Sequence, residues 1–381
     1  MDSNSEKPSA IPNPEKRISR RAFIRLSGAA AAGAGAAYVA YKLGLKDHGT
    51  SSVQIPEIPL PEFVSPAKHQ NILVTLLKDS SSEELYPKGK VELMMEDARN
   101  YYRENSYGKI NFSSEVMDWQ TTSIPIDPTN LEGMAQLGNE VAESSGIETK
   151  PDSTRIYFID RRGKKVDVGG RGEKKEPFNR VWIFAEFDST DAKQIRHELG
   201  HSLGLGHVDF VSSKFVYGTP EFEQSLDDFT NNLSVDPAGG TADIMGRGDG
   251  HFCVANKVQM GWIKSDQIQT ALGNTSCELD PVENNRGKTL GLRIPKVDTG
   301  DFYYIEYRQP TEIEKNVDEG LYFYIWDEKL GSNVKQFYIR PGHRYIKVGD
   351  EFYDKINGIR VKIVDQNGKA KLQVVFEPKK F

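Results

Sequence analysis

The sequence is short of cysteine and has no concentration of charge of one sign. Its 381 residues include two cysteines, Cys253 and Cys277, which are too few for a thiolate zinc knuckle and too far apart for a CxxC redox site. The two could form one disulfide outside the cytoplasm, or they could stay free and pack as small hydrophobic side chains. The formal net charge is −6. Without a concentrated basic face, the chain is not expected to bind nucleic acid.

Long hydrophobic runs are also missing, and the nearest approach to one lies close to the N-terminus. Ser19–Arg25 (SRRAFIR) resembles a twin-arginine export signal, and an uncharged run rich in alanine and glycine follows from Leu26 to Tyr41. Residues 1–45 are therefore predicted to be a targeting segment for the twin-arginine export machinery, rather than a helix of a domain. This predicts a secreted or surface-anchored protein. The run is shorter than the ~20 residues that span a bilayer, so signal cleavage and retention as a membrane anchor both stay open.

The folded part is predicted to begin after a proline-rich tether at residues 46–67. From 68 to 264, strand and helix patterns alternate, which predicts an α+β domain. The expected strands are 71–77, 109–119, 155–159 and 181–187, and the expected helices are 91–102 and 131–144. The basic, glycine-rich stretch 161–180 is expected to be a solvated loop.

Residues 265–381 show no helical period, and turn signals separate their short apolar runs. This pattern predicts a separate all-β sandwich of roughly 115 residues. The expected strands are 289–294, 302–307, 320–326, 334–339, 360–364 and 371–376.

The strongest chemical signal is the segment HELGHSLGLGH at residues 197–207. On a helix, His197 and His201 lie one turn apart on the same side, which is the spacing at which two imidazoles bind one zinc ion. Glu198 lies beside them, where it could take a proton from an attacking water. Gly204 can end the helix in a left-handed turn, so that His207 reaches the same ion. Three neutral ligands leave one position open, which is typical of a catalytic zinc site.

The helix that carries this segment is expected to begin at a cap, either Ser189 or Asp191, and to run to about Leu203. Its core-facing stripe would consist of Ala192, Ile195, Leu199 and Leu203.

These letters match HExxHxxGxxH, the signature of the metzincin zinc peptidases. Metzincins carry a methionine in a tight turn beneath the metal, and Ala242–Gly246 (ADIMG) is similar to that Met-turn. The resemblance implies a metzincin-like catalytic domain over 68–264, with a mixed twisted sheet and an active-site helix. It also implies a zinc cofactor, a structural role for Met245, and endopeptidase activity on protein or peptide substrates.

Shorter segments resemble the gametolysin family and the related immune inhibitor A family. They are Ser106–Lys109 (SYGK), Asn256–Trp262 (NKVQMGW) and Phe302–Arg308 (FYYIEYR). His207 favours the gametolysin side, because immune inhibitor A relatives commonly place aspartate at the third ligand. Asp209 is the fallback ligand.

The sequence also departs from some metzincins. Gly246 and Arg247 follow Met245, so no tyrosine stands two residues after it to act as an extra ligand or oxyanion donor. No cysteine occurs in the N-terminal segment, which excludes a cysteine-switch latency mechanism. His251 is expected to be structural, and no calcium-loop spacing is recognisable among the acidic residues.

The expected reaction is peptide-bond hydrolysis, in which zinc polarises the scissile carbonyl and activates water. Glu198 would act as general base and then pass the proton to the leaving amine. The substrate is expected to extend beside an edge strand, with 155–159 or 181–187 bordering the cleft. Two alternatives stay open: a cell-surface binding protein with a vestigial zinc site, and a zinc amidase or glycan-modifying hydrolase.

Overall fold

The structure is a computed structural model that describes residues 59–60 and 69–377, apart from 81, 123–124, 148–152, 163–168, 176–177, 186–190, 214–232, 285–286, 297–298, 313, 315–316, 329–332 and 338–344. The chain divides into two compact units, and all described residues belong to the unit Pro56–Glu377. The predicted export segment and nearly all of the tether lie outside the described residues. None of the helices described is both long enough and apolar enough to cross a bilayer.

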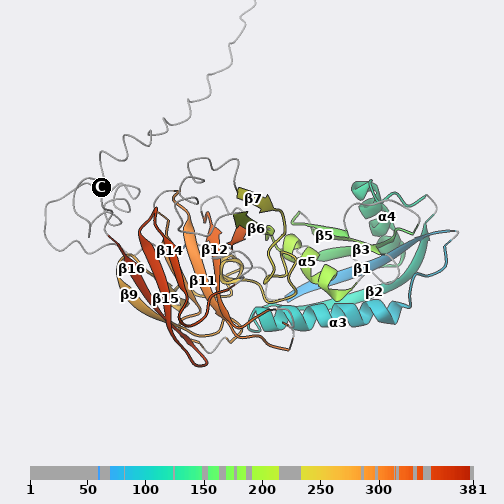
Figure 1. Cartoon of the computed structure of the whole chain (residues 1–381). Coiled ribbons are helices and arrows are strands. Elements are labelled where there is room, and N and C mark those ends of the chain that lie inside the picture. Colours follow the sequence, from blue (N-terminus) through green and yellow to red (C-terminus); the bar gives the residue numbers. More distant parts are fainter. Residues whose placement is uncertain are drawn as a thin grey trace, which may run out of the picture. The chain divides into compact units, whose positions relative to one another are not determined.

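Five strands form the sheet of the part predicted to be catalytic (Figure 1). Their spatial order is β2 (Asn111–Thr122), β1 (His69–Asp79), β3 (Thr154–Asp160), β5 (Asn179–Ala185) and β4 (Gly170–Glu173). Neighbouring strands are parallel, except that β4 runs antiparallel to β5. The sheet is therefore mixed, and its antiparallel edge strand is short.

Alternate side chains of this sheet belong to two cores. One face packs against α3 (Lys88–Asn105) and α5 (Ala192–Ser202), and the other packs against α4 (Leu131–Ser144). In β3, for example, Ile156 lies in the first core and Tyr157 in the second. Because successive strand residues point to opposite faces, a strand covered on both sides is apolar along its whole length.

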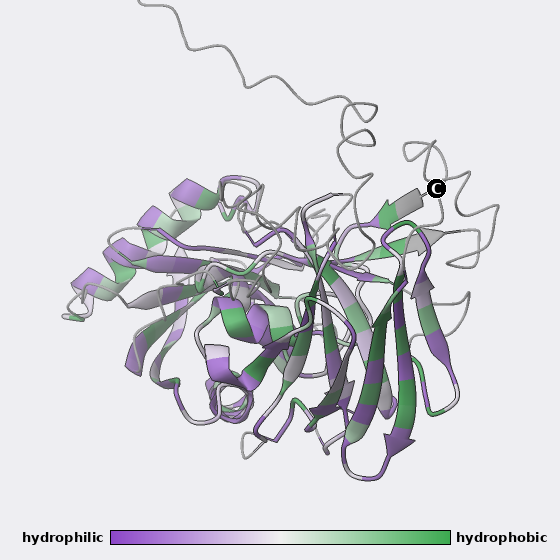
Figure 2. Cartoon of the chain, turned by 90° about the vertical axis from the view of Figure 1, so that its left-hand side faces the viewer, coloured by the Kyte–Doolittle hydropathy of each residue, from purple (hydrophilic) through white to green (hydrophobic). Residues whose placement is uncertain are grey.

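Two further sheets make up the β-rich part. A seven-stranded sheet has the order β7-β6-β13-β12-β11-β10-β8, and a four-stranded sheet has the order β14-β15-β16-β9. The two share one apolar core, so they form a sandwich. Figure 2 shows the alternation behind this packing as green and purple bands along the strands. The strands, with two short helices, are β6 (Val208–Ser213), β7 (Leu233–Asp236), α7 (Val254–Gln259), η1 (Ser265–Gln267), β8 (Ile268–Thr270), β9 (Thr275–Leu279), β10 (Gly291–Pro295), β11 (Phe302–Arg308), β12 (Gly320–Trp326), β13 (Val334–Phe337), β14 (Glu351–Asp354), β15 (Ile359–Gln366) and β16 (Ala370–Phe376).

The seven-stranded sheet is covered on both faces. Ile305 and Phe323 lie in the sandwich core, whereas Tyr304 and Tyr324 lie in the core that contains α3 and α5. Every residue of β11 is buried for this reason. The β-rich part therefore shares a core with the part that carries the histidine motif.

One strand pair also joins these two parts. β6, which follows His207 directly, pairs in parallel with β13, with Val208 opposite Val334. β7 pairs antiparallel with β6. Strands from both sides of the predicted boundary at residues 264 and 265 therefore form a single sheet.

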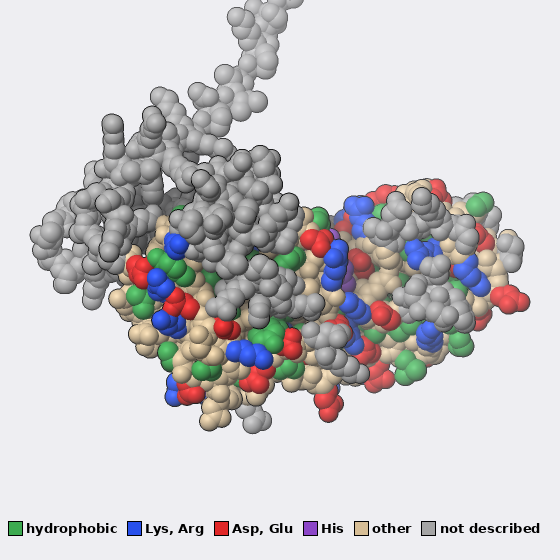
Figure 3. All heavy atoms as spheres, viewed as in Figure 1, with side chains coloured by type: hydrophobic (Ala, Val, Ile, Leu, Met, Phe, Trp, Pro, Cys, Tyr) green, Lys and Arg blue, Asp and Glu red, His purple; other side chains and the backbone are tan. Residues whose placement is uncertain are grey.

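Charged side chains are distributed without segregation on the face drawn in Figure 3. Blue basic and red acidic groups alternate over its described atoms.

Among the described residues, six short strands were not predicted from the sequence: β4, β6, β7, β8, β9 and β14. Each has between three and six residues, too few for an alternating pattern to stand out. The expectation of a solvated loop over 161–180 is wrong for Gly170–Glu173, which forms β4. The two cysteines are free and buried, with Cys253 in one core and Cys277 in the other.

The shared sheet predicts that a chain ending at Lys264 cannot assemble the histidine site. Without β13, β6 loses its neighbour on one side, and His207 loses a fixed approach direction. We expect less than a tenth of the zinc bound by the full chain, measured by metal analysis after desalting, together with a loss of near-ultraviolet circular dichroism. A chain ending at Glu377 serves as the control. Stoichiometric zinc in the shorter chain would show that the sheet connection is dispensable.

Candidate metal and catalytic site

The helix that carries the histidine motif is bounded by specific local interactions. The Asp191 side chain caps α5 by accepting a hydrogen bond from the Gln194 backbone N–H at 3.1 Å. The helix ends at Ser202, and Gly204 has a φ of +98°, a left-handed value that glycine adopts at little cost. The chain then turns back toward the helix, which lets His207 approach the helical histidines from another direction.

The three histidines of the motif converge on one point. Nε2 of His201 lies 3.1 Å from Nε2 of His207, and one ligand atom from each of His197, His201 and His207 lies within 4.8 Å of the others. Ligands at about 2.0–2.1 Å from a tetrahedral zinc ion are roughly 3.3 Å apart, so this spacing is compatible with a single ion. Within the described residues, this is the one group of three or more metal-ligating side chains.

Backbone carbonyls fix the other ring nitrogens. Nδ1 of His197 lies 2.7 Å from the Ile244 carbonyl oxygen, and Nδ1 of His201 lies 2.8 Å from that of Leu205. A carbonyl can only accept, so each Nδ1 carries the hydrogen and each Nε2 keeps its lone pair. This is the tautomer that a metal bound through Nε2 requires.

Burial keeps these imidazoles neutral. It lowers the pKa of His197 to about 4, and it lowers the pKa values of His201 and His207 as well. A protonated ring has no lone pair to offer, so the neutral form is the one that binds metal. Spacing, tautomer and charge therefore all fit zinc, and a three-nitrogen set leaves a fourth position open.

Glu198 lies beside the triad on the same helix and is 7% exposed. Burial raises the pKa of its carboxyl to about 8, and a hydrogen bond from the Gly172 backbone opposes that rise. A divalent cation on the neighbouring histidines would further favour the charged carboxylate. A group poised near neutral pH can both accept a proton and release it.

The edge strand β4 lies directly against α5. A Cβ atom at Gly172 would overlap the carbonyl oxygen of Glu198 and lie 2.9 Å from Cβ of His201. A Cβ at Gly170 would lie 2.8 Å from Cγ of Glu198. Larger residues would push the strand away from the helix. Residues 155–159 and 181–187 were expected to border the cleft; β3 and β5 are interior strands, and the outer strand beside α5 is β4. Phe184 of β5 does line a cavity together with His197 and Glu198.

Met245 lies beneath the helix. It is fully buried, and a Cβ atom at Gly200 would overlap its Sδ. The turn is held by Asp243, whose Oδ1 accepts a hydrogen bond from the Met245 backbone N–H at 2.7 Å. Ile244 in the same turn supplies the carbonyl that binds His197. The turn therefore orients a candidate ligand as well as packing below it.

Asp209, the fallback ligand, is engaged elsewhere. Its carboxylate accepts hydrogen bonds from the Ala238 backbone at 3.0 Å and from Nδ2 of Asn333 at 3.2 Å. It does not belong to the group of converging ligand atoms. Asp209 thus ties β6 to the segment before β13.

Two contributions from the β-rich part were not expected from the sequence. Oε1 of Gln336, on β13, accepts a hydrogen bond from the Thr241 backbone N–H at 2.7 Å, just before the Met-turn. Asn333 packs so closely on Gly206 that a Cβ there would overlap its amide oxygen. No sequence motif marks either residue, since only the pairing of β6 with β13 brings them to the site.

His251 lies in a different environment. Its ring is fully buried, with Nε2 3.1 Å from the Glu104 carboxylate and Nδ1 3.3 Å from Nζ of Lys257. It is not part of the converging group. His251 therefore belongs to a buried network of charged side chains.

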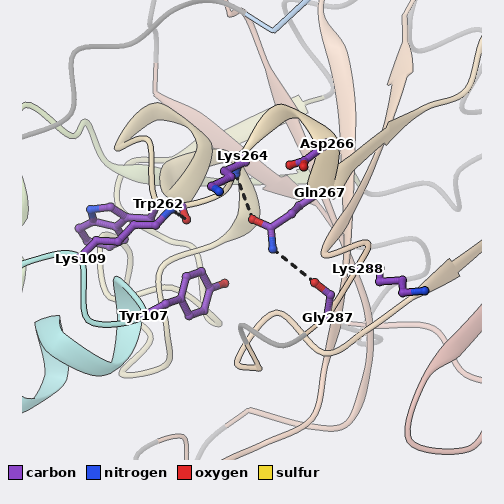
Figure 4. A pocket seen from close by; sticks show the side chains of 8 residues that line it. All are labelled: Tyr107, Lys109, Trp262, Lys264, Asp266, Gln267, Gly287 and Lys288. Carbon is purple, nitrogen blue, oxygen red and sulfur yellow. Dashed lines mark hydrogen bonds between the residues drawn. The ribbon is translucent and has the colours of Figure 1, made fainter.

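A cavity of about 490 Å³ shares no residue with the histidine motif. In Figure 4, Lys109 reaches the Trp262 carbonyl oxygen, and Gln267 reaches that of Gly287 at 3.3 Å. A second cavity, of about 390 Å³, includes His197 and Glu198 in its lining. The second cavity is the one relevant to chemistry at the triad.

Comparisons with known proteins give distant structural neighbours only. No protein-family model and no curated protein matches the sequence. A chaperone–substrate complex is 15% identical with a TM-score of 0.26, covering 40% of this chain and 26% of that chain. Metalloproteinase-II from Bacteroides fragilis is 10% identical with a TM-score of 0.30, covering 56% and 59%. OgpA from Akkermansia muciniphila, solved as a catalytically inactive form with an O-glycopeptide substrate, is 10% identical with a TM-score of 0.29, covering 72% and 85%. The chain thus spans less than two thirds of the first two structures, and the function proposed below rests on the site itself.

The close contact between β4 and α5 makes Gly172→Ala a sharp test. Its methyl group would meet the Glu198 carbonyl oxygen, so we expect a loss of roughly 1–3 kcal/mol in the free energy of unfolding. Gly273→Ala is the matched control, because nothing lies within 4 Å of a Cβ there. Urea unfolding of both variants gives the comparison. Equal stability of the two would show that β4 does not press on the helix.

If His207 rather than Asp209 is the third zinc ligand, substitutions at these two positions should change the zinc affinity by different amounts. His207→Ala removes a converging nitrogen, so competition with a chromophoric chelator should show affinity weakened by at least about 100-fold, more than the loss of an outer-shell partner gives. Asp209→Asn should weaken it much less. The reverse order would make Asp209 the third ligand.

Proposed function

We propose that this protein is a zinc-dependent endopeptidase that hydrolyses peptide bonds of extracytoplasmic proteins. The observation that carries the proposal is the convergence of three imidazoles, two of which, those of His197 and His201, have their Nδ1 atoms bonded to backbone carbonyls. Glu198 stands beside them in a buried position. A vestigial site would be expected to have lost a ligand or the base, and this chain keeps all four groups.

His197, His201 and His207 would hold the zinc ion. When bound in such a site, zinc supplies Lewis-acid chemistry, acidifying water and polarising a carbonyl. The protein would hold the three imidazoles in position, and their burial would keep the rings unprotonated.

Glu198 would handle the proton. As water attacks the scissile carbonyl carbon, the carboxylate accepts the water proton, and it then delivers that proton to the nitrogen of the leaving amine. The contact with Gly172 holds Glu198 near the edge strand, which keeps the base beside an incoming peptide.

The substrate would extend along β4. This strand pairs with β5 on one side and is the outer strand of its sheet. An exposed strand edge can bind an extended peptide through backbone hydrogen bonds. Gly170 and Gly172 bring this strand close to the helix that carries the triad.

The proposal includes export. The arginine pair near residue 20 supports delivery by the twin-arginine machinery to the outside of the cytoplasmic membrane, as a secreted or surface-anchored enzyme.

Glu198→Gln tests the chemistry. The amide cannot accept a proton, so zinc content should stay near that of the wild type while kcat on a quenched fluorescent peptide falls by about 10²–10⁴-fold. Glu96→Gln, on the exposed side of α3, is the control. Chelation should abolish turnover in the wild type, and zinc should restore it. Undiminished cleavage by Glu198→Gln would refute the assigned role, and absence of cleavage of any protein or peptide by the zinc-loaded wild type would refute the proposed function.

A further inference from the structure

Asp243 is a fully buried acid in the segment between β7 and α7. Its Oδ1 accepts the hydrogen bond from the Met245 backbone N–H at 2.7 Å. Its Oδ2 accepts hydrogen bonds from the Cys253 backbone N–H at 2.5 Å and from Nδ2 of Asn256 at 3.0 Å. Cys253 directly precedes α7 and Asn256 lies in its first turn. One carboxylate therefore links the Met-turn to the beginning of α7.

The donors around Asp243 favour its ionised form. Burial raises the pKa of the carboxyl, and hydrogen bonds from the Cys253 and Met245 backbones oppose that rise. All three donors are N–H groups, and a protonated acid would point its own O–H at one of them, whereas a carboxylate only accepts. Removing the carboxylate would leave these buried donors without partners, which is costly because water does not reach them.

Two consecutive carbonyls of the Met-turn contact the segments that carry candidate zinc ligands. The Ile244 carbonyl oxygen lies 2.7 Å from Nδ1 of His197. The next carbonyl, that of Met245, accepts a hydrogen bond from the Val208 backbone N–H at 2.9 Å. Val208 directly follows His207 in the chain. The position of the Met-turn therefore determines the positions of two candidate ligands.

The turn has little room to adjust around Asp243. The Gly246 backbone N–H donates to the Asp243 carbonyl at 3.0 Å, and a Cβ atom at Gly246 would overlap the Gly240 carbonyl oxygen. Gly240 in turn donates its N–H to the Val208 carbonyl at 2.9 Å. The backbone of Val208 is thus held from two sides, by Gly240 and by Met245. A displaced turn would displace Val208 with it.

We propose that Asp243 is a positioning residue that sets the directions of His197 and His207 toward the metal. It acts through the two carbonyls of the turn and is not one of the converging ligands. The inference rests on the proposed function and adds a residue to the support of its metal site. His201 provides an internal reference, because its ring bonds to the Leu205 carbonyl within its own segment.

Asp243→Asn tests the proposal with almost no change in side-chain size. The amide has one acceptor oxygen where the carboxylate has two, so it cannot satisfy both the Met245 N–H and the donors at α7. Ring-nitrogen chemical shifts, measured by NMR on the zinc-free full chain, report which nitrogen of each imidazole carries the hydrogen. We expect Nδ1–H for His197 and His201 in the wild type. In Asp243→Asn, the shifts of His197 should move toward a mixture of tautomers, whereas those of His201 should stay.

Zinc affinity, measured by competition with a chromophoric chelator, is the second readout. We expect Asp243→Asn to bind zinc about 10–100-fold more weakly, the loss typical when the support of a metal-ligating histidine is removed. Asn256→Ala keeps the carboxylate and removes one of its donors. It should change both readouts in the same direction by a smaller amount, and it carries the test where Asp243→Asn does not fold.

Val374→Ala is the control for a loss of stability alone. Val374 is buried in the sandwich core, so shortening it lowers the resistance to urea without touching the Met-turn. This variant should keep the His197 shifts and the zinc affinity of the wild type.

Unchanged His197 shifts and zinc affinity in both Asp243→Asn and Asn256→Ala would overturn the inference. An equal loss of zinc affinity in Val374→Ala would do the same, because it would reduce the effect of Asp243 to stability. If both readouts changed as expected but the zinc-loaded wild type cleaved no peptide, the proposed function would fail while the positioning role of Asp243 stood.

Discussion

Hydrogen bonds from imidazole Nδ1 atoms to backbone carbonyls determine where the Nε2 lone pairs point, and the rest of the site depends on them. The two bonds differ in origin. His201 bonds to Leu205, four residues along the chain, so its orientation needs little more than the turn that Gly204 permits. His197 bonds to Ile244, 47 residues away, so its orientation requires the Met-turn to be in place. One candidate ligand is thus oriented by local geometry and another by tertiary structure.

The second constraint is that β4 and the Met-turn must approach the backbone of α5 closely. Gly172 brings the edge strand to the carbonyl of Glu198 from one side, and Gly200 brings the helix onto Met245 from another. With side chains at these positions the helix could not lie between strand and turn. The same compactness excludes water from Glu198, which is why burial raises its pKa. Packing and acid–base behaviour therefore have one cause.

The sequence predicted those parts of the site that are encoded locally. The helix with a cap at Ser189 or Asp191, of which the structure has Asp191, the turn at Gly204 and the spacing of the histidines all follow from short-range rules. The long strands and α4 were also predictable, because their apolar periods extend over several residues. β4 was not predicted, because a short segment of glycines and charged residues is also typical of a solvated loop. Only the position of this segment in the sheet, beside the helix, identifies it as a strand. Gln336 and Asn333 could not be found, because only a parallel pairing between distant strands brings them to the site.

The parallel pairing of β6 with β13 determines when, during synthesis, the proposed active site can form. During synthesis the histidine motif is made long before β13, and a nascent chain folds from its N-terminal side. Until β13 arrives, β6 has no partner on that side, and the third histidine has no defined direction. The proposed hydrolytic centre is therefore completed only after nearly the whole polypeptide has been made.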